Sequence, residues 1–432
     1  MPASSDNPTA REPGAFRTHI GSHDVAALAS GRDTPFFVYD AAAIRQRIAE
    51  LGAFDVVRYA QKACSNIAVL DLCRRHGVLV DATSAGEVTR ALRAGYGAGG
   101  EPPEIVYTAD IFDRESLDLI VELGVHVNCG SPDMIRQYGE RVGSGAITLR
   151  LNPGFGHGHS QKTNTGGDQS KHGIWHTDLA DAVAMAKSVG LEVSGIHVHI
   201  GSGADMEHLS EVCGAVERLA RTVGPSIHTV SGGGGLPIPY EPGEERVSLD
   251  EHYRLWRDTQ DRLAADFGHP VSLEIEPGRY IVAESGYLVT EIRAIKTMGA
   301  NTFYVVDAGF NNLARPVLYG AYHPMSVVAG DGRRSDGDVV DVVVGGPLCE
   351  SGDIFTQREG GYVRTQGLPR AAVGDYLVIE CAGAYGASMG SNYNSKPLAA
   401  ELLIDGPRVF EVRARQTSDD LVRGESIPDY DS

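Results

Sequence analysis

Several features that would assign a protein to a class at once are missing from this sequence. Its six cysteines lie far apart, and no two form a Cys-x-x-Cys pair. This spacing favours reduced thiols over a disulfide framework or a structural zinc site. No apolar run is long enough to span a bilayer, and the amino terminus lacks the basic and apolar segments of a signal peptide. We therefore expect a cytoplasmic protein with no membrane partner.

Positive charge is also scarce. The chain has 38 Lys and Arg against 57 Asp and Glu, which gives a formal net charge of −19. A nucleic acid or an anionic membrane requires a concentrated basic surface, so neither is an expected partner. Small charged molecules are compatible with this balance.

The sequence does contain a regular alternation of short β-prone runs and amphipathic helical stretches. Eight strands are predicted, at residues 56–60, 78–80, 105–107, 125–128, 147–151, 195–199, 227–231 and 272–276. The clearest helical stretches between them are 85–94, 178–189, 208–222 and 249–267. Eight strands alternating with helices over this length favour an α/β fold of the (β/α)8 TIM-like barrel type over an open sheet.

Beyond Arg279 the helical periodicity fades. The runs that follow are β-rich, at residues 287–295, 302–306, 339–344, 376–380, 401–404 and 408–412. We therefore expect a second, all-β C-terminal domain. The predicted division assigns residues 39–282 to the barrel and residues 1–38 with 283–432 to the β-rich domain.

Lys62 stands at the end of the first predicted barrel strand, after Val56 to Ala60. Burial of an unpaired ammonium is costly and lowers the pKa of the amine, and a neutral amine can form a Schiff base. A strand-end lysine more often extends its ammonium into solvent, and this stretch alone favours that interpretation. The other strand ends change the balance.

The carboxyl ends of barrel strands form one mouth, where reactive groups and phosphate sites gather. His199 ends the sixth predicted strand, a run of four glycines follows Ser231 after the seventh, and Glu276 ends the eighth. Consecutive glycines let backbone amides approach an anion, and Ser202 offers a hydroxyl group. Without its position, the glycine run would equally indicate a flexible turn.

A lysine, an anion cradle and a carboxylate at one mouth together predict pyridoxal 5'-phosphate as the cofactor. Lys62 would hold the aldehyde, the glycines the phosphate, and Glu276 the ring nitrogen, which keeps the ring a strong electron sink. His199 would stack on the ring.

A metal-dependent hydrolase is the rival interpretation. His197 and His199 point to the same side of a strand, and His157 and His159 are spaced in the same way. A hydrolytic site needs further ligands at this mouth, and Glu276 is the one clear candidate, so we expect no metal.

Alternation along two neighbouring strands makes one further prediction. Arg58 would share a face with Lys62, and Glu274 a face with Glu276. Because neither side chain tolerates burial without a partner, we expect Arg58 and Glu274 to form a buried pair below the site.

With these residues in view, the chain from about Phe36 to about Thr417 resembles the fold-type III pyridoxal-phosphate decarboxylases, whose fold is alanine racemase-like. Among them it is most similar to the bacterial diaminopimelate decarboxylases. The resemblance is carried by the motifs Tyr59–Asn66, Asn152–His159, Ser170–Gly173, His197–Ser202, Gly233–Leu236, Glu276–Arg279, Asp307–Phe310 with Arg315-Pro316, Cys349–Asp353 and Gly383–Gly386.

The resemblance implies a role for each matched position. Lys62, Cys349 and His199 would be catalytic, with Cys349 returning a proton after decarboxylation. The implied cofactor-binding residues are Lys62, His199, Ser202, Gly233, Gly234, Gly235, Glu276, Gly278, Arg279 and Tyr385. The implied substrate-binding residues are Arg279, Arg315, Tyr319, Glu350 and Tyr385.

The resemblance also implies a homodimer with shared active sites, in which the loop of Cys349 and Glu350 reaches the partner's Lys62. The implied reaction is the decarboxylation of meso-2,6-diaminopimelate to L-lysine, the last step of lysine biosynthesis. Alternatives are a sister decarboxylase acting on ornithine, arginine, carboxynorspermidine or a carrier-bound amino acid, and a non-catalytic homologue. Two arginines and a glutamate suit a substrate that has a second amino acid centre. A site for a plain diamine precursor such as ornithine would have little use for paired guanidinium groups.

Overall fold

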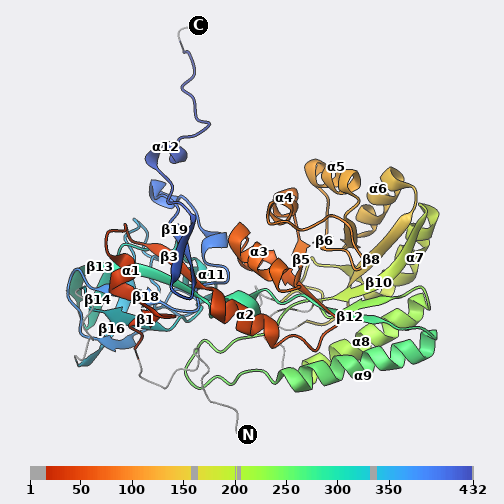
Figure 1. The fold of residues 1–432 in the computed structure, drawn as a ribbon, viewed down its shortest axis with the longest axis horizontal. Helices are drawn as coiled ribbons and strands as arrows, with labels where there is room; N and C mark the ends of the chain where they lie inside the picture. Colours follow the sequence, from red (N-terminus) through yellow and green to blue (C-terminus); the bar gives the residue numbers. More distant parts are fainter. Residues whose placement is uncertain (1–15, 157–163, 200, 202–205, 331–337, 431–432) are drawn as a thin grey trace. The chain divides into compact units, whose positions relative to one another are not determined.

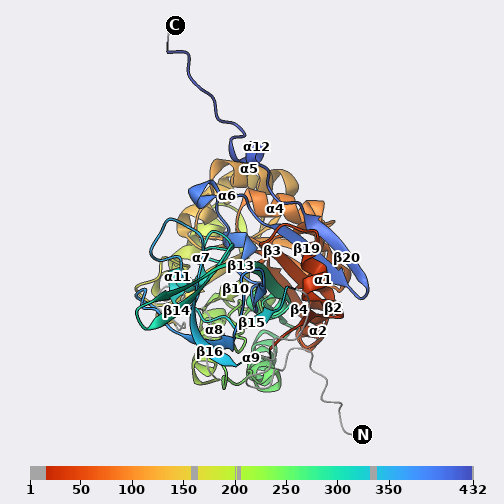
Figure 2. The same ribbon diagram turned by 90° about the vertical axis from the view of Figure 1, so that its left-hand side faces the viewer.

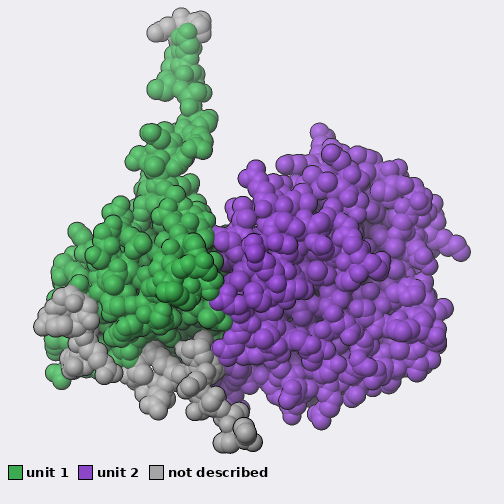
Figure 3. Space-filling model, in the orientation of Figure 1, with its two compact units in different colours: residues 1–43, 240–243, 283–432 green, residues 44–239, 244–282 purple. Residues whose placement is uncertain are grey.

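The structure is a computed structural model that describes residues 16–156, 164–199, 201, 206–330 and 338–430. It divides into two compact units (Figure 3), one of residues 44–239 and 244–282 and the other of residues 1–43, 240–243 and 283–432. The first of these, purple and labelled unit 2 in Figure 3, holds a barrel, and the second, green and labelled unit 1 there, is mostly sheet.

The first unit is a closed barrel of eight parallel strands with helices on its outside (Figure 1). Its strands are β4 (Val56–Ala60), β5 (Leu79–Ala82), β6 (Ile105–Ala109), β7 (His126–Cys129), β8 (Gly145–Asn152), β10 (Leu191–Val198), β11 (Thr229–Ser231) and β12 (Ser272–Ile275). Each pairs with the next in this order, and β12 pairs with β4 to close the ring. The predicted (β/α)8 barrel is confirmed.

Several outer helices of the barrel begin at a side chain that caps the first turn. The outer helices are α3 (Ile67–Arg75), α4 (Ala85–Arg93), α5 (Arg114–Leu123), α6 (Pro132–Val142), α7 (Leu179–Ser188), α8 (Met206–Val223), α9 (Leu249–Phe267) and α10 (Arg279–Val282). The longest, α9, begins where the Ser248 hydroxyl accepts a hydrogen bond from the Glu251 amide and ends at Gly268, whose φ is 75°. Short additions are β9 (Ile174–Trp175) and the 3-10 turns η1 (Gln61–Ala63) and η3 (His176–Asp178).

The second unit is built around a mixed sheet of the order β17-β16-β14-β13-β3-β19-β20, in which β18 also pairs with β13, and β15 pairs with β18. Its strands are β3 (Phe36–Asp40), β13 (Gly286–Met298), β14 (Asn301–Val306), β15 (Met325–Val328), β16 (Val339–Gly345), β17 (Gln366–Pro369), β18 (Tyr376–Ile379), β19 (Ala400–Asp405) and β20 (Arg408–Arg413). Because β3 lies between β13 and β19, segments from both ends of the sequence share one sheet (Figure 2).

The remaining elements of this unit are short. They are β1 (His19–Ile20), β2 (His23–Asp24), α1 (Val25–Ala29), α11 (Arg315–Tyr319), η4 (Ala387–Met389), η5 (Tyr393–Ser395) and α12 (Ser418–Leu421), and α2 (Ala41–Ala49) continues from β3 into the barrel unit. The core joins α1 to the sheet through residues such as Leu28, Val38, Val289 and Leu402. Among the described residues, no helix is both long and apolar enough to cross a membrane.

Candidate active site

Lys62 lies at the mouth of the barrel, in η1 directly after β4. Its neighbours Gln61 and Ala63 are buried, but Lys62 itself is exposed. Lys62 is therefore accessible, which agrees with the interpretation that this stretch alone favours, and its role in catalysis stays a prediction. Its positive charge contributes to lowering the pKa of His199 and opposes the rise in the pKa of Asp81.

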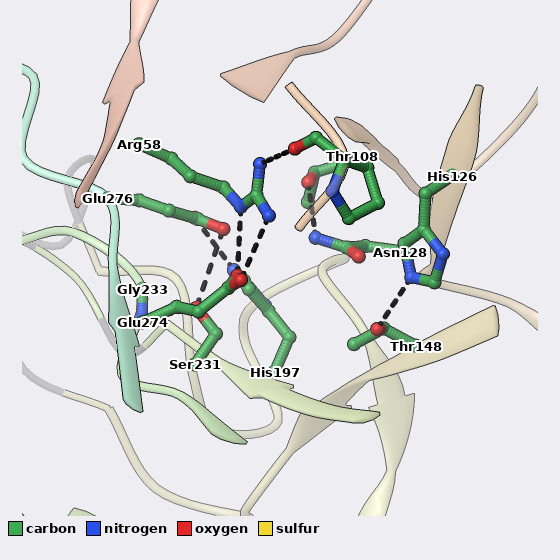
Figure 4. Close-up of polar contacts among 11 residues, drawn as sticks. Arg58, Thr108, His126, Asn128, Thr148, His197, Ser231, Gly233, Glu274 and Glu276 are labelled. Carbon is green, nitrogen blue, oxygen red and sulfur yellow. Dashed lines mark hydrogen bonds and ion pairs between the residues drawn. The ribbon is translucent and has the colours of Figure 1, made fainter. Parts of the chain in front are cut away.

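Glu276, the first residue after β12, is the centre of a buried hydrogen-bond network (Figure 4). His197 Nε2 donates to Glu276 Oε2 at 2.8 Å, and Ser231 Oγ donates to Glu276 Oε1 at 3.5 Å. The Gly233 amide in turn donates to Ser231 Oγ at 3.2 Å. Strands β10 and β11 and the residue that follows β12 thus each contribute one member, which fixes the carboxylate among them.

The electrostatic environment keeps Glu276 ionised. Burial by itself raises the pKa of this carboxyl, but its neighbours together, led by His197 through its charge and its hydrogen bond, outweigh that effect and lower the pKa to about 2. The charge of Arg150 acts in the same direction. A buried carboxylate that stays charged is suited to hold a proton on a cationic ring nitrogen.

His199, the first residue after β10, is kept neutral. Burial of its ring and the positive charge of Lys62 both place its pKa well below the usual value for histidine. Its Nδ1 is buried and has no hydrogen-bond partner among the described residues. A neutral imidazole ring is a suitable face for stacking, since it adds no like charge beside Lys62.

The glycines after β11 form a tight cradle. A Cβ atom at Gly233 would lie 2.7 Å from His199 Cβ, one at Gly234 would lie 2.6 Å from the Glu276 carbonyl oxygen, and one at Gly235 would lie 2.3 Å from the Gly201 carbonyl oxygen. Gly233 and Gly235 also have positive φ angles of 62° and 106°. Packing and backbone conformation therefore both require glycine here.

Gly278 packs the loop after β12 against the strand that leads to Lys62. A Cβ atom at Gly278 would lie 2.9 Å from the Ala60 carbonyl oxygen and 3.1 Å from Ala63 Cβ. Arg279 follows at the start of α10 and is partly exposed.

On β4 and β12, before these strands end, Arg58 and Glu274 form the predicted buried pair (Figure 4). Arg58 Nε donates to Glu274 Oε2 at 2.8 Å, and Arg58 Nη2 donates to Glu274 Oε1 at 2.9 Å. Both residues are buried, and the prediction made from strand alternation is confirmed. A bidentate contact of this kind satisfies both charged groups at once.

Asp81 is a buried carboxyl group at the barrel that was not predicted from the sequence. It lies on β5, 3% exposed, and its Oδ1 has no hydrogen-bond partner among the described residues. Burial first, and then the charge of Glu276, raises the pKa of this carboxyl well above its usual range. The same strand-end rule that selected Lys62 would have selected Asp81, because it stands near the end of the second predicted strand.

The other predicted residues lie in the second unit. Arg315, at the start of α11, is 6% exposed, and its Nη1 donates to His323 Nε2 at 2.9 Å. Tyr319 ends the same helix. Tyr385 has a φ of 58°, an uncommon value for a residue other than glycine and one that is concentrated at functional sites.

Cys349 and Glu350 lie on an exposed loop after β16. The buried carboxylate of Asp353 holds this loop, because it accepts hydrogen bonds from the Phe310 amide at 2.7 Å and the Leu348 amide at 2.8 Å. All six cysteines are free thiols, and Cys349 alone among them is exposed. Burial raises the pKa of the thiols of Cys73, Cys129, Cys213 and Cys381.

Comparison with known proteins decides the family. The family model described as "Pyridoxal-dependent decarboxylase, pyridoxal binding domain" matches residues 42–283. The chain is 51% identical over 406 residues to diaminopimelate decarboxylase of Escherichia coli strain K12, and the match covers 94% of this chain and 97% of the relative. This chain belongs to the diaminopimelate decarboxylase family.

Solved structures agree with this family assignment. A crystal structure of diaminopimelate decarboxylase superposes with a TM-score of 0.90 at 52% identity, covering 92% of this chain and 95% of that one. The diaminopimelate decarboxylase of Helicobacter pylori, solved as a complex with L-lysine, has a TM-score of 0.82 at 30% identity and covers 92% and 98%.

Pyridoxal phosphate, the cofactor of this decarboxylase family, fits the residues at the barrel mouth. The glycine cradle leaves no room for side chains, Glu276 is a charged acceptor, and the His199 face is neutral. Ser202, His157 and His159 lie outside the described residues. Within the described part of the chain, no group of three or more His, Cys, Asp or Glu residues could hold a metal ion.

Proposed function

We propose that this chain catalyses the pyridoxal-phosphate-dependent decarboxylation of meso-2,6-diaminopimelate to L-lysine and carbon dioxide, as the last step of lysine biosynthesis. The observation that carries the proposal is the grouping of Lys62, His199, Glu276 and the Gly233–Gly235 cradle at one barrel mouth, in a member of the diaminopimelate decarboxylase family.

The barrel residues are proposed to hold the cofactor. Lys62 carries it through its amine, and His199 stacks on its ring. Gly233, Gly234, Gly235, Ser202, Gly278 and Arg279 bind its phosphate, with Tyr385 as a further contact. When bound, pyridoxal phosphate supplies an electron sink for the electron pair that stays on the substrate carbon when carbon dioxide leaves. Glu276 accepts a hydrogen bond from the ring nitrogen and keeps its proton in place.

The substrate is proposed to meet Arg279, Arg315, Tyr319, Glu350 and Tyr385. Diaminopimelate has a second amino acid centre at its far end, so its site needs cations for the distal carboxylate and an anion for the distal ammonium. The guanidinium groups of Arg279 and Arg315 match a carboxylate with paired donors, and Glu350 supplies the anion.

Cys349 is proposed to return a proton to the carbon that loses carbon dioxide. Its exposed thiol lies on a loop held by Asp353, and not in the core, where a thiol would be inert. We further propose that the enzyme is a homodimer in which this loop completes the partner's site, so that the barrel binds the cofactor and the β-rich domain completes the site and the dimer interface. Free thiols throughout the chain are compatible with a cytoplasmic location.

The proposal is tested with purified protein supplied with pyridoxal phosphate. Release of carbon dioxide is measured with diaminopimelate, ornithine, arginine and lysine as separate substrates. We expect turnover of diaminopimelate alone. Turnover of ornithine or arginine in place of diaminopimelate would assign the chain to a sister decarboxylase.

Two lysine variants test the mechanism. Lys62→Ala removes the amine that holds the cofactor, so we expect activity to fall at least about 1,000-fold and the absorbance of bound cofactor to change. Lys187→Ala, an exposed position in the last turn of α7, is the matched control and should keep wild-type activity. A fully active Lys62→Ala variant would contradict the mechanism.

A further inference from the structure

His323 is a buried histidine of the second unit that no part of the proposed chemistry uses. It is 1% exposed and lies between Arg315 and the backbone of Glu380. Its Nε2 is 2.9 Å from Arg315 Nη1, and its Nδ1 is 2.9 Å from the Glu380 carbonyl oxygen. Each ring nitrogen therefore lies at hydrogen-bond distance from a polar group.

These two partners fix the protonation state of His323. A carbonyl oxygen only accepts hydrogen bonds, so Nδ1 carries a hydrogen and donates it to Glu380. A guanidinium group only donates, so the Nε2 lone pair accepts from Arg315. Both contacts exist together only in the neutral ring with its hydrogen on Nδ1.

The histidine itself is firmly anchored. Glu380 follows β18 directly, and its amide donates to the Pro324 carbonyl oxygen at 2.8 Å. The Glu380 carboxylate accepts hydrogen bonds from Ser326 Oγ at 2.7 Å and from Arg17 Nε at 3.0 Å. His323 is thus attached to the end of the β15 and β18 pair, where Met325 lies opposite Ile379.

A second ring constrains the same guanidinium group. Arg315 Cζ lies 4.5 Å from the centre of the Tyr240 ring, and the Tyr240 ring meets the His323 ring edge-on at 5.5 Å. The tyrosine covers the guanidinium group by a cation–π contact, while the imidazole accepts one of its N–H groups. A neutral acceptor orients the arginine and adds no negative charge that would compete with a carboxylate ligand.

We infer that His323 is a positioning residue that orients Arg315 for the distal carboxylate of the substrate. This inference rests on the proposed function, in which Arg315 binds diaminopimelate. The distal carboxylate takes no part in the bond cleavage and is present in the ground and transition states alike. Loss of the orientation should therefore raise KM and leave kcat nearly unchanged.

Two conservative variants separate the two nitrogens of His323. The amide of His323→Gln reaches the position of Nε2 and can still accept from Arg315. The shorter amide of His323→Asn reaches the position of Nδ1, keeps the contact with Glu380 and loses Arg315. We expect His323→Asn to raise KM for diaminopimelate about 10- to 100-fold, as the loss of a hydrogen bond to a charged group implies, and His323→Gln to stay within about threefold of wild type.

A pair of ligands gives a readout that general damage to the fold would not reproduce. L-Lysine keeps the distal carboxylate, and cadaverine lacks it. In calorimetric binding to the holoenzyme, His323→Asn should weaken lysine about tenfold or more and leave cadaverine unchanged. Equal weakening of both ligands, or equal KM values for the two variants, would overturn the inference.

The outcomes also separate this inference from the proposed function. A wild-type enzyme that fails to decarboxylate diaminopimelate refutes the proposed function. An active wild type whose His323→Asn variant has a wild-type KM refutes only the role of His323. If His323→Asn does not fold, His323→Gln decides alone: a KM within about threefold of wild type supports the role, and a tenfold rise refutes it.

Discussion

At the scale of single residues, the pair of Arg58 and Glu274 shows how the barrel tolerates charge in its interior. Removal of one partner leaves a buried charge without compensation, so Arg58→Met should lower the free energy of unfolding by about 3–5 kcal/mol. Replacement of both partners by methionine removes both desolvation costs, so the double variant should recover most of that loss. Denaturant titrations of the three proteins measure the difference, and a double variant less stable than Arg58→Met would contradict it.

His126, on β7, makes stability depend on pH. Its Nε2 lies 2.9 Å from Thr148 Oγ1, and burial, with a smaller contribution from the charge of Arg58, lowers its pKa from 6.5 to about 4. Between pH 6.5 and pH 4, His126 is therefore protonated in the unfolded chain but neutral in the folded chain. The free energy of unfolding falls as the pH decreases from 6.5 towards 4.

The size of this effect follows from the shift. By pH 5, His126 should account for about 2 kcal/mol of the lost stability. Free energies of unfolding measured from pH 7.5 to pH 4.5 should fall less steeply for His126→Gln than for wild type. Parallel curves would show that His126 does not titrate as expected.

At the scale of elements, Gly139 lets α6 approach the residue that follows α7. A Cβ atom at Gly139 would lie 2.2 Å from Val189 Cγ2 and 2.7 Å from Val189 Cβ. We expect Gly139→Ala to destabilise the chain by about 1–3 kcal/mol, because this contact outweighs the better helix propensity of alanine.

A second helical glycine provides the control for Gly139. In α8, a Cβ atom at Gly214 would have Arg218 Nη1 as its nearest neighbour, at 3.5 Å. Gly214→Ala should therefore stabilise the chain by up to about 1 kcal/mol. Thermal unfolding of the two variants measures the contrast, and shifts of the same sign would contradict the packing argument.

The elements also show how far the sequence could predict the fold. Strand β4 and helix α9 have the predicted bounds, because apolar periodicity and clear end signals coincide there. The prediction began β10 at residue 195, four residues late, although its first half alternates in burial and pairs with β8. The four-residue strands β15 and β17 were not predicted, since their pairing partners β18 and β16 lie far along the chain.

The sequence could likewise predict some residues of the candidate site and not others. Residues at strand ends, such as Lys62 and Glu276, could be selected because a barrel collects strand ends at one mouth. His323 could not be selected, since it lies in an irregular segment and its two partners meet it only through the tertiary fold. Sequence pattern therefore located groups at the ends of barrel strands and missed His323, whose contact with Arg315 arises only from the tertiary fold.

At the scale of the whole molecule, the proposed dimer predicts complementation between inactive variants. In a shared site, Lys62 comes from one subunit and Cys349 from the other. Co-expression of Lys62→Ala and Cys349→Ala chains should give mixed dimers with one intact site, so random pairing should restore about a quarter of the wild-type activity. Lys62→Ala with Glu276→Ala is the control, because both residues lie on the barrel of one subunit and no intact site can form. Decarboxylase assays of the purified mixtures measure both, and no gain from the first pair would contradict a shared site.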